Sequence, residues 1–317
     1  LTNRVNFVLI AEPSRRAYVR RINVAGNNRT RDEVVRREFR QLESAWYDGD
    51  KIKLSRDRVD RLGFFTEVNI DTQEVPATTD QVDLTVNVVE KPTGSVSLGA
   101  GFSSTEKVAL SFGIRQENAF GSGNYLATEI NTSKYNRTIV VSTTDPYFTP
   151  EGISRTIDVF HRTTRPYLGD LNAYSLVSSG AGMRFGVPFS EIDTVYFGVN
   201  LEQTSIRPGN NLPNAYVEYM QQFGYTSTSL PFTIGWSRDG RDSALVPTRG
   251  ILQRFNSDLS ASGDARYVRT NYQIQQYTPL TKKYTLALNA DLGWGQGLSN
   301  RPYPLFKNYF VGGLGSV

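Results

Sequence analysis

The sequence predicts a small α+β domain followed by a large antiparallel β domain of the kind that crosses a membrane as a barrel. One observation is a shift in composition. Residues 1–91 hold 31 charged side chains against 35 in residues 92–317, while 30 of the 37 aromatic residues follow Lys91, which is typical of a domain boundary. The other is strict alternation of apolar with small or polar residues, as in residues 284–293. Such alternation suits lipid on one face and water on the other.

Charge and cysteine content exclude several classes of function. The net charge of +4 divides into +1 and +3 for the two parts, and neither has the dense basic patch of a nucleic-acid-binding protein. The absence of cysteine suits an oxidising compartment and excludes thiolate nucleophiles and cysteine-based metal sites. No apolar run reaches the roughly 18 residues of a transmembrane helix.

The first domain, residues 15–91, begins with a strand and a helix. The strand covers residues 18–24 and ends at a Gly-Asn-Asn turn. Thr30 and Glu33 form a capping box, and the apolar residues that follow at helical spacing are Val34, Val35, Phe39 and Leu42.

A second helix and two strands complete this domain. The helix covers residues 50–62 and ends at Gly63. Strands follow around residues 68–70 and 82–88, with a turn between them. The predicted order is strand, helix, helix, strand, strand, which gives a two-layer α+β fold.

The N-terminal residues echo the end of this domain. Residues 8–12 (VLIAE) precede a proline, and residues 86–90 (VNVVE) precede Lys-Pro, at an offset of 78 residues. Because a short repeat at a fixed offset is a sign of tandem modules, we expect residues 1–14 to be the last strand of a preceding copy.

The second domain, residues 92–317, predicts about eleven strands, the first near Gly94 and the last ending near Gly295. Tight turns alternate with longer links, as expected of a transmembrane barrel with short turns on one side; the tight turns lie near residues 121, 146–152, 188, 239–250 and 279, and the links near 162–173, 206–224 and after 295. An odd strand number does not close an ordinary bacterial barrel, so we expect an incomplete barrel that ends in a long surface loop. A water-soluble sandwich is the alternative.

Several ordered motifs resemble a known family. RREFRQLESAW and RLGFFTEVNIDT in the first domain resemble the POTRA domain, the periplasmic module of outer-membrane assembly and secretion barrels. Four segments of the second domain resemble turns of the BamA family in the POTRA-plus-barrel superfamily; they are QENAFGSGN (116–124), DPYFTPEGISR (145–155), GVPFSEID (186–193) and WSRDGRDSALVPTRG (236–250).

The resemblance implies a barrel of roughly sixteen strands, of which about eleven are present, and a non-enzymatic function without cofactor or metal. That function is assembly and insertion of β-barrel proteins into the bacterial outer membrane, with the POTRA domain in the periplasm. The implied partners are unfolded outer-membrane client proteins, accessory lipoproteins and the lipid bilayer, with no nucleic acid. The alternative is a two-partner secretion transporter that exports an extended protein.

The first barrel strand is the main candidate site. It is poor in the β-branched and aromatic residues that favour strand pairing, and its glycines weaken register. Resemblance to the BamA family favours lateral opening here and pairing with client strands; the simpler alternative is that small residues relieve crowding at the barrel seam. The candidate edge is Gly94, Ser95, Val96, Ser97, Leu98, Gly99, Ala100, Gly101 and Phe102.

Three further candidate sites follow. An edge strand of the first domain is predicted to accept an extended chain, or else to be a solvated edge guarded by acidic residues; its residues are Glu67, Val68, Asn69, Ile70 and Asp71. The resemblance implies lipoprotein docking after the first helix, at Arg36, Arg37 and Glu43. It also implies a surface-loop motif at the end of the sequence, with Val311, Gly312, Gly313 and Gly315.

Other groups favour structural interpretations. His161 lies in a predicted strand and is interpreted as a surface or lumen histidine rather than a catalytic base. Asp239 and Asp242 are interpreted as members of a turn with local ion pairs. The Gly-x-Gly triplets do not open a helix after a buried strand, so they are not nucleotide-binding loops. The basic residues from Arg15 to Arg21 are interpreted as a solvated strand edge, with a role near anionic lipid headgroups as the alternative.

Overall fold

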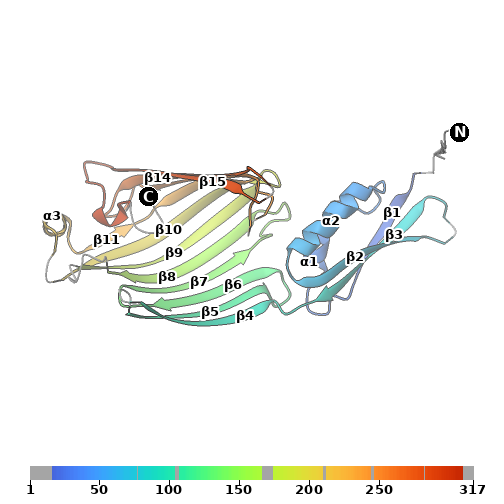
Figure 1. Cartoon of the computed structure of the whole chain (residues 1–317), viewed down its shortest axis with the longest axis horizontal. Helices are drawn as coiled ribbons and strands as arrows, with labels where there is room; N and C mark the ends of the chain where they lie inside the picture. The colour runs from blue at the N-terminus through green and yellow to red at the C-terminus, as the bar shows by residue number, and fades with distance from the viewer. Residues whose placement is uncertain are drawn as a thin grey trace. The chain divides into compact units, whose positions relative to one another are not determined.

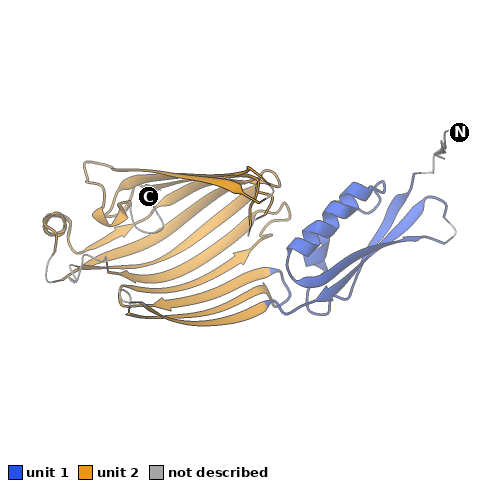
Figure 2. Ribbon diagram, viewed as in Figure 1, with its two compact units in different colours: residues 1–93, 120–123 blue, residues 94–119, 124–317 orange. Residues whose placement is uncertain are grey.

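The computed structural model describes residues 16–76, 78–103, 107–165, 174–209, 212–243, 246–281 and 283–309. The chain forms two compact units, one of residues 1–93 and 120–123 and the other of residues 94–119 and 124–317 (Figure 2). The N-terminal strand predicted over residues 1–14 lies outside the described residues.

No helix in the described part of the chain is both long enough and apolar enough to cross a membrane.

Unit 1 is a two-layer module built on a three-stranded sheet (Figure 1). Its strands are β1 (Tyr18–Ala25), β2 (Phe65–Glu74) and β3 (Gln81–Glu90). They lie in the order β1-β3-β2, with β3 parallel to β1 and antiparallel to β2. Helices α1 (Asp32–Arg36) and α2 (Gly49–Arg61) complete the predicted strand-helix-helix-strand-strand order, which is confirmed.

The core of this module follows from alternation along the central strand. Every second residue of β3 from Val82 to Val88 is buried, and these side chains contact apolar residues of both helices, including Val34, Val35 and Val59, which are fully buried. Helix α2 begins at an aspartate cap, because the Asp48 side chain accepts hydrogen bonds from the N–H groups of residues 50 and 51. The predicted second helix is therefore confirmed.

The prediction of a long first helix with a capping box is wrong. Helix α1 has five residues, and its N-cap is Arg31, with no side-chain cap. The Thr30 N–H instead donates to the carboxylate of Glu90, 2.6 Å away at the end of β3. Leu42, predicted to face the core, is 66 % exposed, because the chain leaves the helix after residue 36 and runs as a loop beside β1.

Unit 2 is one antiparallel sheet. Along its hydrogen-bonded path from β4 to β15 the described residues form eleven strands, which confirms the predicted number, and a short strand, β11, pairs with β10 beside this path. Successive strands lie side by side in Figure 1. They are β4 (Gly94–Ser103), β5 (Lys107–Ala119), β6 (Asn124–Thr132), β7 (Asn136–Asp145), β8 (Ser154–Thr164), β9 (Tyr174–Pro188), β10 (Asp193–Pro208), β11 (Thr226–Ser229), β12 (Phe232–Asp239), β13 (Gly250–Ser260), β14 (Tyr267–Pro279) and β15 (Thr285–Gly297).

The two faces of this sheet differ in chemistry. One face, called here the outer face, carries exposed apolar side chains from β4 to β15, such as Leu98, Val159 and Leu292, which are 84, 55 and 67 % exposed. The opposite, inner face carries polar and charged residues such as Glu202 and Asp258. An exposed apolar face of this extent is typical of a surface that contacts lipid or another protein.

A helix and a return segment pack together beside the inner face. Helix α3 (Asn214–Phe223) lies in the connection after β10, where the sequence predicted only a long link. Residues 298–309, called here the return segment, follow β15 and include the 3-10 helix η1 (Leu305–Lys307). Tyr219 of α3 and Phe306 of η1 meet edge to face, with ring centroids 6.1 Å apart.

Polar contacts hold the return segment to the strands. The Lys307 Nζ lies 2.6 Å from the Glu202 Oε2, and the two side chains are only 16 and 14 % exposed. The Tyr309 hydroxyl donates to the Thr270 carbonyl at 2.7 Å. These contacts join the segment after β15 to both β10 and β14.

Candidate functional site

The free edge of the large sheet lies at β4. Among the described residues β4 pairs only with β5, in register from Gly94 opposite Gln116 to Ser103 opposite Lys107. Its outward side chains Val96, Leu98 and Phe102 are 72, 84 and 78 % exposed. The other long side of β4 therefore presents backbone donors and acceptors to any strand that pairs with it.

The glycines of β4 are not all required by space. A side chain at Gly99 would meet the Ser111 hydroxyl on the neighbouring strand, whereas a Cβ at Gly101 has no described atom within 4 Å. Crowding within the described sheet thus accounts for Gly99 but not for Gly101. The remaining consequence of glycine at position 101 is weaker strand pairing.

The module has a second free edge at β2. This strand pairs only with β3 among the described residues, with an irregular register near its start, between Phe65 and Glu67. Val68 is buried against the helices, while Glu67, Asn69 and Asp71 are exposed. The candidate edge residues thus lie on a sheet edge with one apolar and one polar face.

The opposite edge of the module is covered. The N–H of Val19 donates to the Ala45 carbonyl at 3.0 Å, and the Val19 carbonyl accepts from the Ser44 N–H at 2.7 Å. The Tyr47 N–H donates to the Ala17 carbonyl at 2.8 Å. Residues 44–47 thus cover the first part of the β1 edge, whereas no described segment pairs with the outer side of β2.

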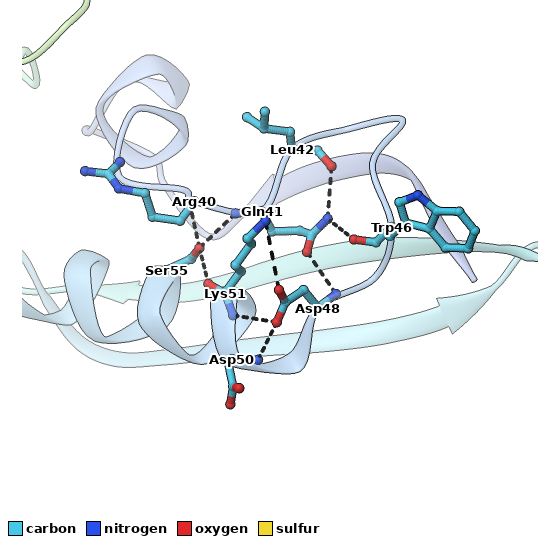
Figure 3. A network of polar contacts seen from close by, with 8 residues as sticks. All are labelled: Arg40, Gln41, Leu42, Trp46, Asp48, Asp50, Lys51 and Ser55. Atoms are coloured by element: carbon cyan, nitrogen blue, oxygen red, sulfur yellow. Dashed lines mark hydrogen bonds and ion pairs between the residues drawn. The ribbon is translucent and has the colours of Figure 1, made fainter. Parts of the chain in front are cut away.

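A buried polar network holds this covering loop in place (Figure 3). The Gln41 side chain, 1 % exposed, donates to the carbonyls of Leu42 and Trp46 at 3.1 and 2.9 Å and accepts from the Asp48 N–H at 3.0 Å. The Ser55 hydroxyl, on α2, accepts from the Arg40 N–H at 2.8 Å and donates to the Lys51 carbonyl at 2.7 Å. The loop is thereby fixed to helix α2.

The structure brings two of the three predicted docking residues together. Arg36 and Glu43 approach to 3.3 Å and flank Ile22 of β1: the Ile22 N–H donates to the Glu43 carboxylate at 2.8 Å, and the Ile22 carbonyl accepts from Arg36 at 2.6 Å. Both side chains therefore help to cover the β1 edge. Arg37 is half-buried and takes no part in this pair.

Glu90, where the module ends, has a perturbed pKa. Burial by itself raises the pKa of this carboxyl, but hydrogen bonds from the backbone of Thr30 and Arg29 outweigh burial and hold the pKa below its usual value. The ionised Glu90 thus ties the end of β3 to the loop before α1. No local pattern in the sequence indicates this contact, because Thr30 and Glu90 are 60 residues apart.

The other candidates keep their structural interpretation. His161 is exposed on β8, with its Nδ1 2.8 Å from the Ser179 hydroxyl. Asp239 pairs with Arg241 at 2.7 Å, and hydrogen bonds from Thr248 and Arg249 lower the pKa of Asp242 to about 2, as expected of a turn. No group of His, Asp and Glu in the described ranges is placed to hold a metal ion.

The surface-loop motif Val311, Gly312, Gly313 and Gly315 lies outside the described residues. Of the stretch from Arg15 to Arg21, Arg20 pairs with Asp83 on the neighbouring strand. Sequence reasoning missed the Glu202–Lys307 contact, which joins residues 105 positions apart. Helix α3 was also missed, although Tyr216, Tyr219 and Met220 follow helical spacing.

Family comparisons match both units. Residues 118–317 match the Omp85 superfamily domain, and residues 17–91 match the POTRA family, described as a surface antigen variable number repeat. Over its whole length the chain is 38 % identical to the outer membrane protein assembly factor BamA of Neisseria meningitidis, and it spans 41 % of that relative. It is 26 % identical over 99 % of its length to the assembly factor BamA of Nitratidesulfovibrio vulgaris, of which it spans 39 %.

Solved structures agree on the fold. The chain superposes on BamA of Haemophilus ducreyi lacking POTRA domains 1–3 with a TM-score of 0.79 and 26 % identity, covering 96 % of this chain and 60 % of that one. CdiB of Acinetobacter baumannii gives a TM-score of 0.56 at 10 % identity, with 95 and 56 % of the two chains covered. The second likeness is one of fold alone.

Proposed function

Because the chain belongs to the Omp85 superfamily, we propose that it is part of a protein that assembles and inserts β-barrel proteins into the bacterial outer membrane. The observation that carries this proposal is the match over the whole chain to a protein named an outer membrane protein assembly factor. The exposed apolar outer face supports placement in a membrane. The module would then lie in the periplasm.

The proposed mechanism uses the edge of β4. Lateral opening of the barrel at this strand exposes the backbone groups of residues 94–102, which pair with an arriving client strand. The three glycines in residues 94–102 weaken the pairing of β4, so that the client strand can exchange in and later leave. The driving force is the client's own burial of apolar surface and of backbone hydrogen bonds in lipid, and no enzymatic step is assigned.

The module supplies two proposed contacts. Its β2 edge, residues 67–71, is proposed to pair with an extended client or with an adjoining module. Arg36, Arg37 and Glu43 are proposed to dock an accessory lipoprotein, and exposure of Arg36 and Glu43 beside the covered β1 edge supports this. A two-partner secretion transporter remains the second candidate, but the named relatives above are assembly factors.

A cross-link in the complete protein tests the mechanism. The chain lacks cysteine, so Ala100→Cys and one cysteine in the barrel's closing strand would form a single defined lock. Locked protein should lose client insertion into vesicles and regain it on reduction. Ala127→Cys with Ser142→Cys, which joins two strands that are already paired, is the matched control and should leave insertion intact. Full insertion with the seam locked would exclude lateral opening.

A depletion experiment separates assembly from secretion. If the protein assembles barrels, depleting it should remove many unrelated barrels from the outer membrane. Loss of one exported protein, with all other barrels retained, would support the transporter instead.

A further inference from the structure

A polar depression lies on the outer face of the sheet, at the end of strands β7 to β10. Its volume is about 360 Å³, and its lining includes Arg137, His161, Arg165 and Arg207, called here the basic cluster. All four side chains are exposed, and none of the described residues that line the depression is acidic. The cluster therefore concentrates positive charge beside the apolar middle of this face.

Strand register shows where the apolar band of the outer face ends. Val141, Val159, Ala181 and Leu201 lie opposite one another across β7 to β10 and form an apolar row. The next row on this face, two residues along each strand, consists of Ile139, His161, Ser179 and Gln203. The row after it consists of Arg137, Thr163, Val177 and Ser205. Each step is about 7 Å, so the cluster begins within one step of the apolar row.

Arg165 and Arg207 lie further along the strands, beyond the polar rows. Arg207 lies opposite Ser175, and the Arg165 N–H donates to the Tyr135 carbonyl at 2.7 Å, which places both at the strand ends. In a membrane barrel the strand ends lie near the interface, where lipid headgroups begin. The cluster thus lies at headgroup depth.

The charge of the cluster is not neutralised within the described structure. None of the ion pairs between described residues uses Arg137, Arg165 or Arg207. Arg165 donates through one guanidinium nitrogen to the Lys134 carbonyl at 2.8 Å, which orients its side chain. Three guanidinium groups lining one depression repel one another unless an anion lies between them.

We propose that the basic cluster binds the phosphate groups of an anionic lipid in the surface-side leaflet. Guanidinium groups match phosphate oxygens through paired N–H donors, and the hydroxyls of Ser133 and Thr163 in the same lining add donors for phosphate or sugar oxygens. The assignment to this leaflet rests on the proposed function: the cluster lies at the strand ends opposite those where β4 leaves the module.

The test uses the full chain in detergent micelles and measures bound lipid by native mass spectrometry. The probes are lipid A with two phosphates, the same lipid without phosphates, and inorganic phosphate. The variant is Arg137→Gln, Arg165→Gln, Arg207→Gln. The control, Arg31→Gln, Arg56→Gln, Arg61→Gln, removes equal charge from exposed positions of the module.

Each basic residue near an anionic lipid surface contributes about fivefold in affinity, so the triple variant should bind phosphorylated lipid A about 100-fold more weakly than wild type or control. Removing the lipid phosphates should have a similar effect on wild type. Equal binding by the triple variant, or equal binding of both lipids, would overturn the proposal. Saturation by inorganic phosphate, without preference for the phosphorylated lipid, would mean a free-anion site and overturn it as well.

Client insertion is measured separately, by the complete protein in phosphatidylcholine vesicles that hold no lipid A. Insertion by the triple variant at the wild-type rate, together with lost lipid A binding, supports the lipid site independently of the assembly mechanism. Absence of insertion by the wild type would count against the proposed function. The lipid-binding result would still stand, because mass spectrometry measures it separately.

Discussion

The Glu202–Lys307 contact makes a quantitative prediction about the return segment. Lys307→Met keeps most of the aliphatic side chain but leaves the Glu202 carboxylate, 14 % exposed, with the Thr204 hydroxyl, 3.3 Å away, as its one hydrogen-bond donor among the described residues. Removing one partner of a fully buried pair costs about 3–5 kcal/mol. Because both side chains retain some contact with water, we expect about 2 kcal/mol here, or roughly 30-fold in the ratio of released to docked segment.

The assay is a double-mutant cycle read by hydrogen exchange. Exchange in residues 298–309 is measured for wild type, Lys307→Met, Glu202→Gln and the double variant, and the coupling energy should be about 2 kcal/mol. The matched control is the inner-face pair Arg115–Glu129, which is 2.9 Å apart but 53 and 46 % exposed. Its coupling should be close to zero, because water screens both charges. Additive effects of the Glu202 and Lys307 substitutions would refute the reasoning.

Three further predictions concern the module and the β4 edge. Gln41→Leu removes three buried hydrogen bonds and should lower the free energy of unfolding of the module by about 3 kcal/mol. The control Leu42→Gln, at the exposed neighbouring position, should leave this free energy almost unchanged. Both values are measured by urea unfolding, with Trp46 as the fluorescent probe and the other two tryptophans replaced by phenylalanine. Glu90→Gln should destabilise the module by about 1.5 kcal/mol at pH 7. Because the pKa of Glu90 is lower in the folded state, the stability that Glu90 contributes is complete above its unfolded pKa of about 4.3 and is lost as the pH falls through its folded pKa. The free energies of unfolding of wild type and variant should therefore converge in acid. A difference in stability that persists in acid would contradict the hydrogen-bond assignment. Gly101→Val has no described steric obstacle and should slow amide exchange in β4 about fivefold through strand preference, with slower client insertion; unchanged exchange would remove weak pairing as the role of this glycine.

The strands were predictable because alternation is a local signal. The alternation at Leu286 and Leu288 predicts an outward face from neighbouring residues alone. Both residues lie in β15, as expected. The order of helices and strands along the module followed from equally local signals, such as Gly63 after α2, whereas the sheet order β1-β3-β2 was not predicted. The edge position of β2 and β4 followed from these assignments.

The failures involve partners distant in sequence. Thr30 and Glu33 form a correct capping-box pattern, but Glu90 binds the Thr30 N–H instead. The basic cluster could not be read from the sequence, since Arg137, Arg165 and Arg207 lie 28 and 42 residues apart and meet only through strand register. Helix α3 begins after Pro213 without a side-chain cap, so its start carried no polar signal.

The covered β1 edge also bears on self-association of the module. If two copies paired their sheets through β2, a symmetric antiparallel pairing centred on Asn69 would set Glu67 of one copy opposite Asp71 of the other. Like charges in directly opposite positions destabilise a strand pair. The same edge that disfavours its own copy attracts a strand with lysine or arginine at these positions. If the β2 edge accepts an added strand, as proposed, these two acidic residues would disfavour a second copy of the module and favour a basic strand.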